Sequence, residues 1–126
     1  MEKRFVVIGS LLFALAIILG AFGAHALKDL IPEKSLNSFE VGVKYQFFQA
    51  LAMITLGINS SSFNFKLNKI LTLMTFGILM FSFSIYLLAI NTFFSFSLKF
   101  LGPITPIGGA LLITAWGIFI VRLIKN

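Results

Sequence analysis

Residues 5–27 read FVVIGSLLFALAIILGAFGAHAL, an apolar stretch without a Lys, Arg, Asp or Glu. About 20 apolar residues suffice for a helix to cross the hydrocarbon core of a bilayer. Three further stretches of this kind follow, at residues 41–58, 70–90 and 106–124. None alternates between apolar and polar residues as the strands of a membrane barrel do. The sequence therefore predicts an all-α integral membrane protein, a four-helix bundle that forms a single transmembrane domain over residues 1–126.

The composition supports this prediction. Hydrophobic residues make up 59% of the chain and charged residues only 11%, against about 25% charged in ordinary globular domains. A soluble domain of this size buries roughly two-thirds of its chain surface, too little to hide so much apolar area. The lipid bilayer is therefore the predicted solvent of the fold.

The first stretch has an alternative interpretation. Ala24-His25-Ala26 has the A-x-A form of a signal-peptide cleavage site. However, the apolar run is longer than the usual 7–15 residues of a signal peptide, and a helix here completes an even number of spans. We therefore expect a retained helix. Helix starts are indicated elsewhere by Asn37 with Glu40, an approximate capping box, and by Thr105-Pro106.

The net charge of +6 is spread as small groups at the ends of the apolar stretches. This distribution lacks the basic stripe of a nucleic-acid-binding surface, so no nucleic-acid partner is predicted. Four spans place both termini on one side, and that side holds most of the basic residues: Lys3, Arg4, Lys66, Lys69, Arg122 and Lys125. The other side holds Lys28, Lys34 and Lys99, with Lys44 near the boundary. Because basic loops stay in the cytoplasm, we predict cytoplasmic termini and a location in the inner (plasma) membrane.

A few polar residues at membrane depth are the candidate site. If the spans alternate in direction, they share one level in the outer half: His25, Tyr45, Gln46, Gln49 and Tyr86. Polar groups in hydrocarbon should turn inward and pair, so we expect His25 to hydrogen-bond a polar side chain of the second span. Two interpretations remain open. The residues form either a structural clasp between helices or a small polar site that opens outward with His25 as proton carrier or ligand.

Small residues indicate where helices pack closely. They occur near the end of the first span and the start of the fourth: Gly20, Gly23, Ala24, Gly108 and Gly109. Soluble-enzyme patterns are missing from the sequence. One histidine and no cysteine argue against a zinc site, and there is no nucleophile elbow or phosphate-binding loop. We therefore predict no enzyme activity, no metal and no cofactor.

Several blocks resemble a known family. They are GAFGAHAL at residues 20–27, GVKYQ at 42–46 and TPIGG at 105–109. These blocks are similar to those of the YwdK/YgdD-like family of small bacterial inner-membrane proteins of unknown function. The resemblance implies four spans and no assigned activity. Members commonly carry a histidine where this chain has Gln49, so a mechanism that needs a pair of histidines is disfavoured here.

Two functional hypotheses follow. The first is a structural or interaction component of the membrane that associates with itself, as a homo-oligomer, or with another membrane protein through its small-residue face. The second is a minimal transporter or channel for a small solute or ion. A continuous polar cavity that reaches past Gln49 toward Lys69 or Arg122 would favour the second hypothesis, whereas a cluster closed by direct hydrogen bonds would favour the first.

Overall fold

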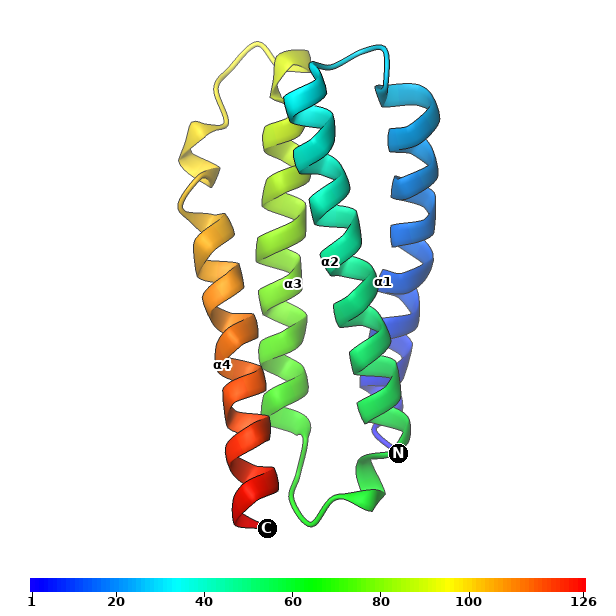
Figure 1. Ribbon diagram of the computed structural model, residues 1–126, viewed down its shortest axis with the longest axis vertical. Coiled ribbons are helices and arrows are strands. Elements are labelled where there is room, and N and C mark those ends of the chain that lie inside the picture. The colour runs from blue at the N-terminus through cyan, green and yellow to red at the C-terminus, as the bar shows by residue number, and fades with distance from the viewer.

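The computed structural model describes residues 1–126, and every regular element in it is a helix. Four long helices make up the fold: α1 (Lys3–Phe22), α2 (Glu33–Ile58), α3 (Asn68–Ala89) and α4 (Ile104–Lys125). Helices that follow one another along the chain run antiparallel, and both termini lie at the same end (Figure 1). Each of the four helices is long and apolar enough to cross a membrane. The predicted all-α fold with four spanning helices is therefore confirmed.

α2 and α4 begin earlier in the chain than the predicted capping residues, Asn37 and Thr105, indicated. α2 begins at Glu33, directly after Pro32, so Asn37 lies inside the helix and does not cap it. An acidic residue in the first turn of a helix interacts favourably with the helix dipole. α4 begins at Ile104, and Thr105 lies inside its first turn together with a proline. Proline is tolerated there because the first N–H groups of a helix have no partner within it. Both predicted caps were wrong.

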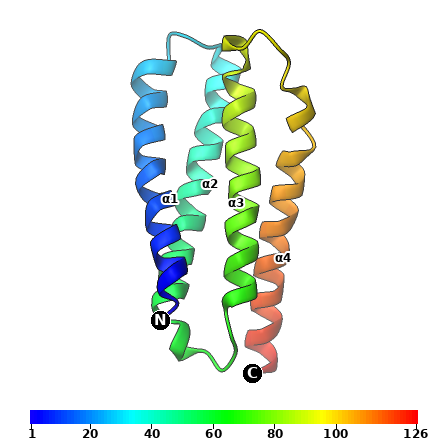
Figure 2. The ribbon, with the colours of Figure 1, turned by 180° about the vertical axis from the view of Figure 1, so that it is seen from behind.

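The helices lie side by side in chain order, with α2 and α3 in the middle (Figures 1 and 2). The extensive interfaces are those of α1 with α2, α2 with α3 and α3 with α4. The two outer helices therefore bury only a narrow stripe each. On α1 the stripe is Phe5, Gly9, Leu12 and Ala16, and on α4 it is Gly108, Leu112 and Ala115. In a bilayer the remaining apolar surface can face lipid tails, which are as apolar as the side chains themselves.

The core has two parts along the helix axes. The larger cluster draws on all four helices and includes Phe5, Met53, Ile70 and Leu112. The smaller one lies around Leu27, Phe39 and Tyr86, toward the α1–α2 connection.

α3 and α4 approach each other closely at two glycines. A Cβ atom on Gly108 would collide with the backbone nitrogen of Phe81 and would lie 2.8 Å from the carbonyl oxygen of Gly77. On the facing helix, a Cβ on Gly77 would lie 2.9 Å from the side chain of Leu112. The two backbones are thus almost in contact, and only glycine fits at position 108.

In the connection between α3 and α4, the side chain of Asn91 joins two distant positions. Asn91 donates from Nδ2 to the carbonyl oxygen of Phe96 at 2.9 Å and accepts at Oδ1 from the backbone N–H of Leu98 at 3.0 Å. Leu98 is buried, whereas the phenylalanines of this connection are exposed: Phe93, Phe94, Phe96 and Phe100. The loop is therefore fixed from within and presents aromatic rings outward.

Candidate functional site

The centre of the polar cluster is Gln46, whose side chain is fully buried on α2. Its Nε2 donates to the carbonyl oxygen of Leu12 on α1 at 2.7 Å. Its Oε1 accepts from the hydroxyl of Tyr86 on α3 at 2.6 Å. One carboxamide therefore ties three helices together. A backbone carbonyl has two lone pairs, so Leu12 can accept this bond without leaving the helical ladder.

A second link joins α2 and α3 next to Gln46. The Oγ of Ser82, also fully buried, donates to the carbonyl oxygen of Gly42 at 2.8 Å. Gly42 has no side chain to block this approach, and a Cβ atom there would lie 2.7 Å from the ring of Tyr86. The same ring packs against Phe39 with centroids 4.8 Å apart. Gly42 and the ring of Tyr86 therefore pack against each other beside the hydrogen bonds of Ser82 and Gln46.

The Gln46 cluster is closed. We define it as Gln46, Tyr86, Ser82 and the carbonyl groups of Leu12 and Gly42. Every buried side-chain nitrogen and oxygen in the protein has a hydrogen-bond partner. Buried polar groups that are fully paired stabilise one arrangement of helices, whereas unpaired ones are costly. Chemically, the arrangement acts as a clasp and leaves no group free to transfer a proton or bind a ligand.

Gln49 and Tyr45 belong to a separate groove. They lie on the side of α2 that faces α4, and they line a cavity of about 530 Å³ together with Phe81 and Trp116. The indole Nε1 of Trp116 donates to Oε1 of Gln49 at 3.2 Å. The ring of Tyr45 packs edge-on against Phe81, with centroids 5.2 Å apart. This groove lies beside the Gln46 cluster and does not include His25.

The predicted hydrogen bond of His25 to the second helix was wrong. His25 is exposed and makes no hydrogen bond to any of the predicted partners. It lies two residues from each of the buried residues Gly23 and Leu27, so it points to the opposite side of the helix. It also lies thirteen residues beyond Leu12, the level of Gln46, and is therefore displaced by about 20 Å along the axis. The five predicted residues do not share one level.

His25 occupies an unusual backbone element. Residues Gly23–Leu27 form a π-helical turn, η1, that continues α1. π-Turns are rare and occur often at functional sites. Here the turn brings Gly23 and Leu27 into the core, where a Cβ on Gly23 would lie 3.0 Å from the ring of Phe39. The turn thus has a packing role at the end of α1.

The predicted small-residue positions pack unequally. Gly23 and Gly108 lie at close contacts within the protein, whereas Gly20 is only in van der Waals range of Val43, 3.4 Å from its Cγ1. Ala24 is exposed, and a Cβ on Gly109 would make only an ordinary contact with Phe81. Of the three first-helix positions, only Gly23 is therefore tightly packed against α2, and Ala24 stays open.

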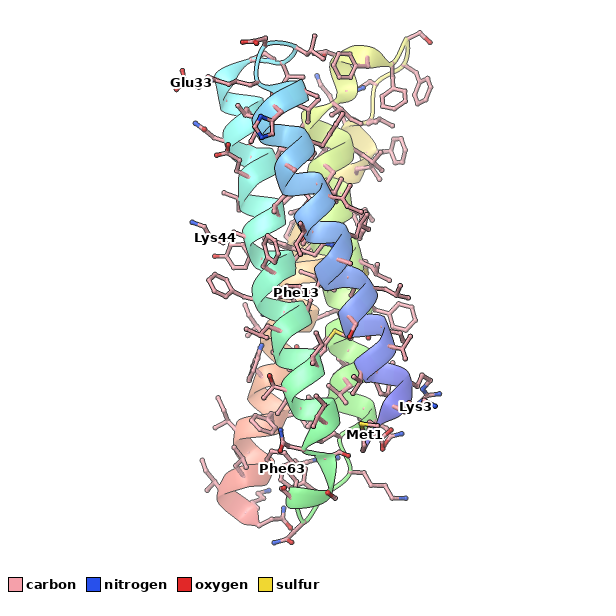
Figure 3. The ribbon with its side chains drawn as sticks, turned by 90° about the vertical axis from the view of Figure 1, so that its right-hand side faces the viewer. Met1, Lys3, Phe13, Glu33, Lys44 and Phe63 are labelled. Carbon is pink, nitrogen blue, oxygen red and sulfur yellow. The ribbon has the colours of Figure 1, made fainter.

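Lys44 lies on the outer face of α2 and points away from the other helices (Figure 3). No group of three or more His, Cys, Asp or Glu side chains is placed so that it could hold a metal ion. The hydrogen-bonding side chains of the Gln46 cluster and of the groove at Gln49 are all neutral.

Comparison with known proteins assigns the chain to a family. A UPF0382 membrane protein of Staphylococcus epidermidis (strain ATCC 12228 / FDA PCI 1200) is 35% identical over 123 residues, which cover 98% of this chain and 97% of that protein. A UPF0382 membrane protein of Staphylococcus aureus (strain USA300) is 37% identical over 123 residues, which again cover 98% of this chain and 97% of that protein. The profile of DUF423, described as a protein of unknown function, matches residues 19–109. The chain belongs to the DUF423 family.

The DUF423 family is described as of unknown function, and the relatives are named membrane proteins, in agreement with the four apolar helices. The matched residues 19–109 contain the π-turn, Gln46, Tyr86 and Gly108, but not Leu12 or Trp116. No solved structure matches the chain.

Sequence reasoning missed several residues that take part in the Gln46 cluster and in the close contact between α3 and α4. Ser82 was visible as a hydroxyl in an apolar stretch, and its spacing from Tyr86 by four residues placed both on one helical face. Gly42 and Gly77 were also visible as glycines inside apolar helices, where a turn cannot explain them. The role of the Leu12 carbonyl group could not be predicted, because every residue has a backbone carbonyl group.

Proposed function

We propose that this DUF423 protein is a structural or interaction component of the plasma membrane. In this role it is a rigid four-helix unit that presents the outer faces of α1 and α4 to its own copies or to another membrane protein. The observation that carries the proposal is the closed Gln46 cluster, in which direct hydrogen bonds join α1, α2 and α3. Such a clasp holds the helices in one arrangement.

The alternative, a minimal transporter or channel, has less support. Its polar site was expected to combine His25 with Gln46 and Gln49, and these groups are dispersed over three places in the fold. The cavity that contains Gln49 is lined by neither Lys69 nor Arg122. These observations favour the structural role.

We further propose that both termini and the α2–α3 connection are cytoplasmic. The support is the distribution of basic side chains along the chain, with six at the end that carries the termini: Lys3, Arg4, Lys66, Lys69, Arg122 and Lys125. Figure 3 shows Lys3 and Glu33 at opposite ends of the molecule. Cytoplasmic loops carry the excess of basic residues in membrane proteins.

Two remaining assignments are also proposals. The GAFGAHAL and GVKYQ blocks lie within residues 19–109, so we propose that the YwdK/YgdD-like proteins and the DUF423 proteins are one family. We propose that the protein is not an enzyme. The support is a sequence with one histidine and no cysteine, in which the histidine stands apart from the buried polar groups.

Cysteine cross-linking in native membranes tests the proposed role. The chain has no cysteine, so single replacements report on single positions. Leu11→Cys on α1 and Ile124→Cys on α4 are suitable because these side chains are 66% and 79% exposed. We expect a discrete cross-linked species from at least one of them, and none from Ala16→Cys, which is fully buried. No cross-link from either exposed position would contradict an interaction role.

A flux assay separates the two hypotheses. Purified protein in liposomes should pass ions and small solutes no faster than protein-free vesicles do. Solute flux that rises with the amount of protein and is lost in Gln49→Leu would overturn the structural proposal in favour of transport.

A further inference from the structure

The groove between α2, α3 and α4 has features of a ligand site that the clasp does not use. Its volume of about 530 Å³ lies within the range of small-molecule pockets. The lining is mainly apolar and aromatic, with Phe81, Leu112 and Trp116 among the side chains. Gly109 and Gly117 also line it, and a Cβ on Gly117 would meet nothing within 4 Å. The groove therefore has free space along α4.

Two hydrogen-bond donors in the groove have no partner within the protein. Indole nitrogen can only donate, so the bond from Trp116 fixes the side-chain amide of Gln49 with Oε1 toward the indole. The Nε2 group of Gln49, with two N–H donors, makes no hydrogen bond to the protein. The hydroxyl of Tyr45 is likewise without a protein partner, whereas the buried hydroxyl of Tyr86 has one. An occupant that carries acceptors would pair both groups.

The depth of Gln49 restricts the occupant. α2 has 26 residues, and Gln49 lies within about 5 Å of its middle at a rise of roughly 1.5 Å per residue. The ester groups of phospholipids stay at the boundary of the hydrocarbon core, about 15 Å from the midplane. Their carbonyl oxygens therefore cannot reach Gln49 while the headgroup remains in water. A plain acyl chain reaches this depth but offers no acceptor.

We propose that the groove binds a neutral, membrane-dissolved molecule with carbonyl acceptors on a flat apolar ring, which is the chemistry of an isoprenoid quinone. The ring packs between Phe81 and Trp116. Gln49 Nε2 donates to one carbonyl oxygen, the hydroxyl of Tyr45 donates to another acceptor of the ring, and the tail leaves the groove into the lipid.

The single tryptophan of the chain makes the test direct. The full-length protein is placed in phospholipid nanodiscs and titrated with decylubiquinone, a short-chain quinone that quenches nearby indole fluorescence. We expect quenching of Trp116 that saturates. Gly117→Leu adds a bulky side chain at the edge of the groove without a backbone clash, and it should weaken the saturable quenching by about tenfold. Gln49→Leu removes the donor and should weaken it by about tenfold.

Thr114→Val is the matched control. Thr114 is on α4, is exposed, and bonds only to the carbonyl oxygen of Ala110 outside the groove. Its quenching curve should match that of the parent protein. Far-UV circular dichroism verifies that each variant is folded. Quenching that rises linearly and equally in all variants would overturn the proposal. Saturable quenching that Gly117→Leu reduces and Gln49→Leu leaves unchanged would contradict the recognition of carbonyl groups.

Discussion

The hydroxyl of Tyr86 on α3 donates to Oε1 of Gln46 on α2 at 2.6 Å, and both side chains are buried. The two residues are forty positions apart in the sequence. Their bond also orients the Gln46 amide, because Nε2 must then point to the carbonyl oxygen of Leu12. The contact therefore sets the register of three helices at once.

The first prediction concerns this pair. Gln46→Leu removes the acceptor of the Tyr86 hydroxyl and the donor to the Leu12 carbonyl in an apolar interior, and it should destabilise the fold by about 1–3 kcal/mol. Tyr86→Phe should cost less, because Gln46 keeps its bond to Leu12. Thermal unfolding in a mild detergent measures both. In the double variant Gln46→Leu/Tyr86→Phe no hydroxyl is left unpaired, so the loss should be smaller than the sum of the single losses. Strict additivity would show that the two side chains are not coupled.

The second prediction compares two glycines on α4. Gly108→Ala places a methyl group against the backbone of α3 at Phe81 and Gly77 and should destabilise the protein by about 2 kcal/mol. Gly117→Ala meets nothing within 4 Å and should be neutral or slightly stabilising, because alanine favours the helix. The melting temperatures of the two variants in the same detergent provide the comparison. Equal losses would mean that the close approach of α3 and α4 is not required for stability.

The four spans could be predicted because the apolar stretches are long and bounded by charges and prolines. Gln46, Gln49 and Tyr86 could be chosen because a polar group in an apolar helix needs a partner. Their partners could not be predicted, because pairing depends on axial register. α2 begins directly after Pro32 and not after the predicted cap Asn37, and these five residues place Gln46 about 7.5 Å further from the start of the helix than expected. The prediction therefore paired Gln46 with His25 near the end of α1, whereas Gln46 contacts Leu12, thirteen residues earlier.

The third prediction concerns the α3–α4 connection. Asn91→Ala removes the two side-chain hydrogen bonds that join Asn91 to Phe96 and Leu98. Amide hydrogen exchange should become faster at Leu98, since its N–H loses its acceptor. The spanning parts of α3 and α4 should remain protected. Thr92→Ala serves as the control, because Thr92 is exposed and bonds to none of the loop residues. Unchanged exchange at Leu98 in Asn91→Ala would show that Asn91 does not hold the loop.

The last prediction is the orientation of the protein in the membrane. Both termini lie at one end of the molecule, together with six basic residues of the chain: Lys3, Arg4, Lys66, Lys69, Arg122 and Lys125. Basic residues keep their loops in the cytoplasm. After Asn126, we therefore expect a reporter that functions only in the cytoplasm to be active and one that functions only outside it to be inactive. A reporter inserted at Lys34, in the first turn of α2, should have the opposite activity. An engineered tag before Met1 gives an independent check of the number of spans. If the tag and the Asn126 fusion lay on opposite sides, the count of four would be wrong. If both lay outside, the count would stand and the charge-based orientation would be reversed.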